Sequence, residues 1–187
     1  TGMMDALKKG VVGSLRIACS TTAGKYVLPQ LAARFCQMNP GVNVCIKRCT
    51  PDHVGPNLLD DDVNLGVVSY EMHEDNIELQ EFFEDSISLI VPSNHPWASR
   101  ASIRPAELIG EPIIMRESTS GTRRVLTSEL AKHDISLDDI HVFMELGNAE
   151  AIVRTVSAGY GVSFVSTLAS ACPLEGGNIV DVPIEDF

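Results

Sequence analysis

The sequence repeats one pattern twice along its 187 residues: a short run of β-branched and other apolar residues, then a stretch with apolar residues three or four positions apart. This alternation is typical of parallel α/β sheets, whose buried strands alternate with helices. In the first repeat it predicts strands at 15–19, 42–46 and 65–69, and helices at 28–38 and from 51 onward. The order β-α-β-α-β indicates one α/β lobe.

The second repeat begins after residue 112. It predicts strands at 113–115, 142–146, 162–165 and 180–184, and helices at 122–133, from 149 to Gly159 and from 167. Val125, Leu126 and Leu130 are expected on the buried face of the first of these helices. The repeat therefore indicates a second α/β lobe.

Two extended stretches, 79–83 and 87–92, lie between the repeats with only Glu84 and Asp85 separating them. The missing turn predicts one continuous strand that leaves the first sheet and enters the second. We expect a first lobe at 14–84 and a second at 85–187. If the lobes are pseudo-symmetric, the first is also expected to lack a return strand and a helix that would follow Phe187.

Composition excludes several classes of protein. With 44% hydrophobic and 21% charged residues the chain is expected to fold, and its formal charge of −11 excludes a free-standing nucleic-acid binder. No apolar run approaches the roughly 20 residues of a membrane span, and no signal peptide is evident. Five cysteines without a CxxC pair indicate a reduced, cytoplasmic protein.

Small polar residues follow the predicted strands, where open α/β sheets bind ligands. We expect two groups of hydroxyls to face each other across an interlobe cleft and to donate hydrogen bonds to a small anion, with Gly121 admitting the ligand and Arg116 or Arg123 adding charge. The candidate ligand-binding residues are Ser20, Thr21, Thr22, Arg116, Ser118, Thr119, Ser120, Gly121, Thr122, Arg123, Gly147 and Asn148.

The same residues have a purely structural explanation. Ser, Thr and Asn are preferred helix N-caps and need no ligand. That explanation is favoured at any single junction, including Ser166 and Thr167 after the strand at 162–165. The occurrence of two hydroxyl triplets on opposing lobes, Ser20, Thr21 and Thr22 and Ser118, Ser120 and Thr122, favours ligand binding instead.

Catalytic and metal sites are poorly supported. The segment 161–165 lacks the second glycine of G-x-S-x-G, and Cys49 with His53 lacks a second pair at ligand spacing. Residues 49–99 carry many acids and no Lys or Arg, which is typical of a solvated face. We predict no catalytic residue, metal or cofactor, a structural His95, and solvated histidines at 73, 133 and 141.

Short motifs also occur in a characteristic order from residue 13 to 184. They are 13–18 (Gly-Ser-Leu-Arg-Ile-Ala), Leu28-Pro29 with Phe35, 39–42 (Asn-Pro-Gly-Val), 94–98 (Asn-His-Pro-Trp-Ala), 116–123 (Arg-Glu-Ser-Thr-Ser-Gly-Thr-Arg) and 158–162 (Ala-Gly-Tyr-Gly-Val). Together they resemble the effector-binding domain of LysR-type transcriptional regulators. Segments 116–123 and 145–151 look most like the regulators of sulfur assimilation and carbon fixation. Asn64 departs from the family, which commonly has Asp there.

This resemblance implies a type 2 periplasmic-binding-protein fold, two Rossmann-like α/β lobes joined by crossover strands. It also implies a preceding winged helix-turn-helix domain, through which alone DNA would be contacted, with residues 1–13 as the tail of a linker helix. Effector contacts map to Ser20, Thr21 and Thr22 and to Ser118, Thr119, Ser120 and Thr122. Homodimers or homotetramers are expected, with no membrane partner.

The sequence thus favours a non-catalytic domain that senses a small anionic metabolite and transmits its binding to a DNA-binding domain. One alternative is an extracytoplasmic solute-binding protein for a small anion. A second is an enzyme on the same scaffold, although only Glu117 is available as a general base near the cleft loops.

Overall fold

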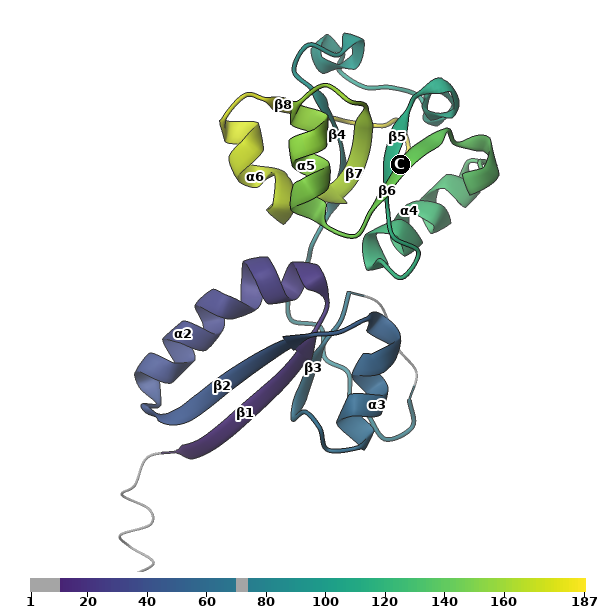
Figure 1. The fold of residues 1–187 in the computed structure, drawn as a ribbon. Coiled ribbons are helices and arrows are strands. Elements are labelled where there is room, and N and C mark those ends of the chain that lie inside the picture. Colours follow the sequence, from purple (N-terminus) through teal and green to yellow (C-terminus); the bar gives the residue numbers. More distant parts are fainter. Residues whose placement is uncertain (1–10, 70–73) are drawn as a thin grey trace, which may run out of the picture. The chain divides into compact units, whose positions relative to one another are not determined.

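The structure, a computed structural model, describes residues 11–69 and 74–187, so most of the predicted linker tail, and His73, lie outside it. It divides into two compact units, the first ending at Glu81 and the second spanning Phe82–Phe187 (Figure 1). No helix in the described ranges is long and apolar enough to cross a membrane.

The first unit contains a parallel three-stranded sheet in the order β2-β1-β3. Its strands are β1 (Val12–Cys19), β2 (Gly41–Arg48) and β3 (Leu65–Val67), and its helical segments are η1 (Ala23–Val27), α2 (Leu28–Met38), η2 (Pro51–His53) and α3 (Val54–Leu59). The predicted β-α-β-α-β order is confirmed, although β3 is shorter than expected.

The two faces of this sheet are covered by different helices (Figure 1). Ile17 and Cys19 of β1 pack with Leu28 of α2, whereas Ala18 packs with Val54 of α3. Alternate residues of β1 thus enter opposite cores, as the period-two geometry of a strand requires.

The strand predicted at 79–83 is wrong. Within the described ranges these residues pair with no strand, and Leu79, Phe82 and Phe83 are exposed. The apolar pattern has the right period, but a strand forms only where a neighbour pairs with its backbone N–H and C=O groups. The continuous strand between the lobes is therefore reduced to β4 (Ile87–Pro92).

The second unit contains a five-stranded sheet in the order β6-β5-β7-β4-β8. Besides β4, its strands are β5 (Ile113–Arg116), β6 (Val142–Leu146), β7 (Val162–Ser166) and β8 (Ile179–Val182). The prediction of a parallel sheet is corrected in part, because β4 runs antiparallel to both β7 and β8. The other pairs, β5 with β6 and with β7, are parallel.

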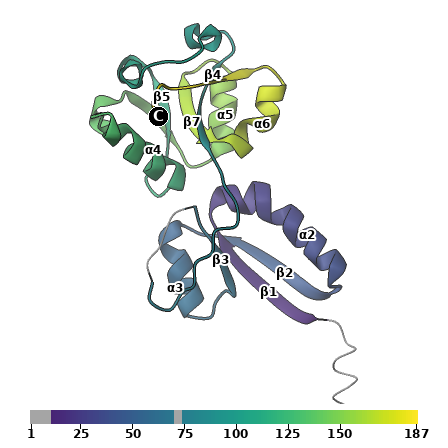
Figure 2. The ribbon, with the colours of Figure 1, turned by 180° about the vertical axis from the view of Figure 1, so that it is seen from behind.

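Helices cover both faces of this sheet (Figure 2). They are α4 (Gly121–Lys132), α5 (Ala149–Ser157) and α6 (Thr167–Glu175), with 3₁₀ turns η3 (Pro96–Ser99), η4 (Pro105–Gly110) and η5 (Leu137–Asp139). Leu126 and Leu130 of α4 are buried as predicted, but Val125 is 46% exposed, a correction. Leu126 and Leu130 are four residues apart and share one helix face, from which Val125 is rotated toward solvent.

The structure confirms the predicted role of one histidine and corrects that of another. His95 is structural as predicted: its Nδ1 accepts from the Trp97 N–H at 3.2 Å and its Nε2 lies 3.0 Å from Glu111 Oε1. His133 is not solvated as predicted, because its ring stacks on Phe187 with centroids 5.6 Å apart. That contact joins residues far apart in sequence, so no local pattern indicates it.

Burial should make the cysteines unequal in reactivity. Burial raises the pKa of the Cys19 thiol to about 11, whereas Cys45 and Cys172 are exposed. At pH 8 a thiol with that pKa is about 0.1% thiolate. We expect iodoacetamide at pH 8 to modify Cys45 and Cys172 first, and Cys19 only as the pH approaches 11 or after unfolding in urea. Peptide mass spectrometry over time measures this; early modification of Cys19 in the folded protein would contradict it.

Candidate functional site

The first group of candidate residues lies at the carboxyl end of β1, the central strand of its sheet. The Ser20 N–H donates to the Val67 carbonyl at 3.0 Å, and the Ser20 carbonyl accepts from the Gly24 N–H at 3.0 Å. The chain thus passes from β1 into a helix whose first turns are the π-helical η1, a wider winding that recurs at functional sites. Backbone hydrogen bonds therefore position this segment and leave its side chains for other contacts.

The hydroxyls of this group make no side-chain hydrogen bond with any residue in the described part of the chain. Ser20, Thr21 and Thr22 are all half-buried, and Thr22 makes no capping bond. Helix capping, the structural explanation offered by the sequence, therefore does not explain why hydroxyl side chains occur at these positions. They remain candidate ligand donors.

The second group surrounds the N-terminus of α4, directly after β5. Ser118 and Thr119 are exposed, while Gly121 and Thr122 are half-buried. Ser120 is only 5% exposed, yet its side chain does not cap α4. The first N–H groups of a helix lack partners within the helix and favour anions. A hydroxyl beside such donors is suited to a small anion.

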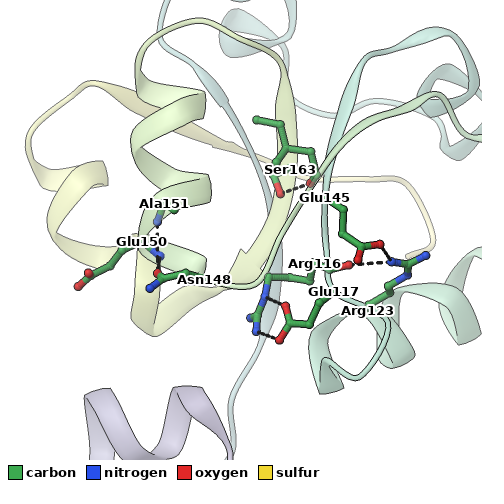
Figure 3. Close-up of polar contacts among 9 residues, drawn as sticks. Arg116, Glu117, Arg123, Glu145, Asn148, Glu150, Ala151 and Ser163 are labelled. Atoms are coloured by element: carbon green, nitrogen blue, oxygen red, sulfur yellow. Dashed lines mark hydrogen bonds and ion pairs between the residues drawn. The ribbon is translucent and has the colours of Figure 1, made fainter. Parts of the chain in front are cut away.

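Asn148 and Ser166, by contrast, are helix caps (Figure 3 shows Asn148). Asn148 Oδ1 accepts from the N–H groups of Glu150 at 2.8 Å and Ala151 at 3.3 Å. Ser166 Oγ accepts from the Leu168 N–H at 3.2 Å and donates to Asp85 at 2.8 Å. The structural explanation therefore holds for these two residues. Gly147 is exposed beside Asn148.

Asp85 titrates abnormally because of its position. Burial raises the pKa of its carboxyl group, while the hydrogen bond from Ser166 opposes that shift. Its charge is therefore a cost to folding that the Ser166 hydroxyl reduces.

The two candidate arginines of this unit are both paired with carboxylates (Figure 3). Arg116 donates to Glu117 through Nε at 2.7 Å and Nη2 at 2.9 Å. Arg123 donates to Glu145 and to the Arg116 carbonyl at 2.9 Å. Neither carboxylate was predicted from the sequence as a partner of these arginines. The adjacency of Arg116 and Glu117 was the available signal, whereas Glu145 is brought close only by the pairing of β5 with β6.

The Cys49 and His53 pair forms no metal site. His53 Nδ1 lies 2.7 Å from the Thr50 hydroxyl, and burial raises the pKa of the Cys49 thiol. Across the ranges that the structure covers, no three His, Cys, Asp or Glu side chains are grouped so that they could hold a metal ion.

Comparison with known proteins identifies relatives of the chain. Residues 8–187 match the family model described as LysR substrate binding domain. A probable RuBisCO transcriptional regulator of Phaeodactylum tricornutum is 31% identical over 97% of this chain, and an uncharacterized HTH-type transcriptional regulator of Methanocaldococcus jannaschii is 31% identical over 99%. The chain spans about 60% of the length of these relatives.

Solved structures give the same result for the fold. The regulatory domain of Synechocystis CcmR, in complex with 2-PG, matches with a TM-score of 0.83 and 30% identity over 94% of this chain and 82% of that one. The effector-binding domain of QuiR in complex with shikimate matches with a TM-score of 0.80 at 22% identity, over 95% and 83% of the two chains. The predicted type 2 periplasmic-binding-protein fold is thereby confirmed.

The comparisons agree on one class of protein. The relatives named above are transcriptional regulators, and the solved neighbours named above are regulatory or effector-binding domains. The similarity to RuBisCO regulators agrees with the carbon-fixation branch predicted from segments 116–123 and 145–151. The chain belongs to the LysR substrate-binding domain family.

Proposed function

We propose that this domain senses a small anionic effector through hydroxyl groups at the starts of two of its helices. They are Ser20, Thr21 and Thr22 in the first unit and Ser118, Thr119, Ser120 and Thr122 in the second. Both groups would contact one effector in the interlobe cleft expected from the sequence. Each unit supports its own half of the proposal, since the hydroxyls lie where helix N–H donors favour negative charge.

The observation that carries the proposal concerns the side chain of Ser120. Asn148 and Ser166 occupy equivalent positions and cap their helices, but Ser120 does not cap α4 although it is almost completely buried. The Ser120 hydroxyl makes no hydrogen bond to any residue in the described ranges and so stays available to a ligand that accepts a hydrogen bond.

The relatives support an anion as the effector. The Synechocystis CcmR regulatory domain, 30% identical to this chain, was solved with 2-PG bound. In this chain Gly121 and Thr122 follow Ser120 at the start of α4, so backbone N–H groups and hydroxyls occur together there. Such a combination suits carboxylate, sulfate or phosphate groups.

The effect of binding would be transmitted to a winged helix-turn-helix DNA-binding domain in the same polypeptide, within a cytoplasmic homodimer or homotetramer. The relatives' names and their greater length support the presence of the DNA-binding domain. An effector can shift such a switch only by binding its two states with different affinity. DNA affinity measured with and without the effector is therefore the corresponding assay on the full-length protein.

Isothermal titration with 2-PG, sulfate, sulfite, O-acetylserine, phosphorylated sugars and nicotinamide cofactors tests the proposal. We expect at least one anion to bind, and Ser120→Ala or Thr22→Ala to weaken it about tenfold or more, as hydrogen bonds to charged groups contribute about 1.5–3 kcal/mol. Thr22→Ser should retain affinity because it keeps the hydroxyl.

Thr127→Ala is the matched control. It removes a hydroxyl from the same helix, α4, where Thr127 Oγ1 donates to the Arg123 carbonyl at 2.8 Å, away from the N-terminus. Its anion affinity should equal that of the wild type. If no anion binds the wild type, or if Ser120→Ala and Thr22→Ala leave binding intact, the site is assigned wrongly.

A further inference from the structure

Charge is strongly segregated along the first unit. Residues 11–51 contain the five basic residues Arg16, Lys25, Arg34, Lys47 and Arg48 and no Asp or Glu, whereas residues 52–85 contain acids and no Lys or Arg. An anion that approaches this unit therefore meets an unfavourable field from the acidic segment. A cation beside the hydroxyls of Ser20, Thr21 and Thr22 would offset it.

Arg48 is placed beside these hydroxyls by the sheet. It ends β2, and its residue partner on the parallel neighbour β1 is Cys19, the residue before Ser20. The Cys49 N–H donates to the Cys19 carbonyl at 3.1 Å, which holds the two strand ends together. Neighbouring strands lie about 4.8 Å apart, so Arg48 and the start of the hydroxyl segment are adjacent at the carboxyl edge.

The side chain of Arg48 also lies on the appropriate face. Val44 and Ile46 of β2 pack with Leu28 and Ala23 on the α2 face, and Arg48 shares that face because strand residues alternate. A side-chain carbon at Gly24 would lie 3.9 Å from Ile46 Cγ2, so the first turn of the helix is next to this row. By the same alternation Lys47 points to the opposite face.

Several other cations of the described residues lie elsewhere or have partners. Arg16 donates to the Asp61 carbonyl at 2.8 Å, Lys25 lies 5.6 Å from the centre of the Tyr26 ring, and Arg34 lies in the second half of α2. In the second unit Arg116 and Arg123 are paired with carboxylates. Arg48 is exposed and has no ion pair or hydrogen bond from its side chain to any residue that the structure describes.

We infer that Arg48 supplies the positive charge for the effector and selects doubly charged, phosphate-type anions over singly charged ones. This inference rests on the proposed function and refines it. A guanidinium matches two oxygens of one phosphate with two parallel N–H···O bonds, whereas hydroxyls alone discriminate little between charges. Arg116 and Arg123, which the sequence suggested as sources of charge, would then stabilise the loop after β5 and would not bind the ligand.

Isothermal titration of the 187-residue chain at constant ionic strength tests the inference, with 2-PG, inorganic phosphate and the monocarboxylate glycolate as probes. We expect Arg48→Gln to weaken 2-PG and phosphate binding about tenfold or more and any glycolate binding by less than about twofold. Arg48→Lys should lie between Arg48→Gln and the wild type, because it keeps charge but loses the bidentate geometry.

Lys47→Gln is the matched control, since it removes the same charge one residue away on the other face. Its anion affinities should stay within about twofold of the wild type. Two outcomes would overturn the role of Arg48 and leave the proposed function standing. One is an equal loss of anion affinity in Lys47→Gln and Arg48→Gln. The other is unchanged affinity in Arg48→Gln when Ser120→Ala abolishes binding. A wild type that binds none of these anions or those titrated above would overturn both.

Discussion

Alanine at Gly161 is expected to lower the free energy of unfolding of the second unit by about 2–5 kcal/mol. Gly161 has φ +124°, a backbone conformation that residues with a Cβ rarely adopt, and a Cβ there would lie 2.7 Å from the Pro112 carbonyl oxygen and 2.8 Å from Phe143 Cε1. The Pro112 carbonyl accepts a hydrogen bond from the Val162 N–H at 3.1 Å, so it cannot move freely. Backbone strain and overpacking therefore act together.

Urea denaturation followed by Trp97 fluorescence measures this loss. Trp97 is the only tryptophan of the chain and is buried in the core of the second unit, so its emission reports on that unit. Gly110→Ala is the control, because it adds the same methyl group where nothing lies within 4 Å and φ is not positive. Equal midpoints for the two variants would show that Gly161 is not under this constraint.

Alanine at Glu117 is expected to destabilise the second unit by about 2–3 kcal/mol. It leaves the guanidinium of Arg116, whose side chain is only 5% exposed, without the carboxylate that accepts two of its hydrogen bonds. Removal of one partner from a fully buried pair typically costs about 3–5 kcal/mol. The lower value is expected because the Glu117 side chain is 30% exposed, which gives water partial access to the pair.

A double-mutant cycle separates this effect from a general loss of packing. Arg116→Met combined with Glu117→Ala should be more stable than Glu117→Ala alone, because the double variant leaves no uncompensated buried charge. Urea denaturation followed by Trp97 again provides the measurement. A double variant whose loss equals the sum of the two single losses would show that the pair is not coupled.

Most helices and strands could be predicted because their signals are local. The apolar spacing along α2 and α5, the apolar runs of β4, β5 and β7, and Gly159 with φ +86° at the end of α5 each depend on a few neighbouring residues. The strand predicted at 79–83 failed because an apolar run becomes a strand only when another strand pairs with it. The predicted burial of Val125 was wrong because the buried face of α4 is narrower than its apolar residues suggested.

The candidate site could be predicted only in part for the same reason. Ser20, Thr22 and Ser120 were selected because they follow strands, and their positions at helix starts agree with that selection. Which of the small polar residues cap a helix, as Asn148 does, depends on a side-chain rotamer that the sequence does not specify. Ser120 and Asn148 are therefore indistinguishable in sequence and different in structure.

By itself the sequence determined the succession of strands and helices, the two-lobe architecture and the location of hydroxyl groups at strand ends, because periodicity and strand order are properties of the chain. Only the tertiary structure decided which cations lie beside groups that are distant in the sequence. Glu145 reaches Arg123 because β5 pairs with β6, and Arg48 adjoins Ser20 because β2 pairs with β1. Electrostatic interactions depend on distances in space, and strand pairing sets those distances between residues far apart along the chain.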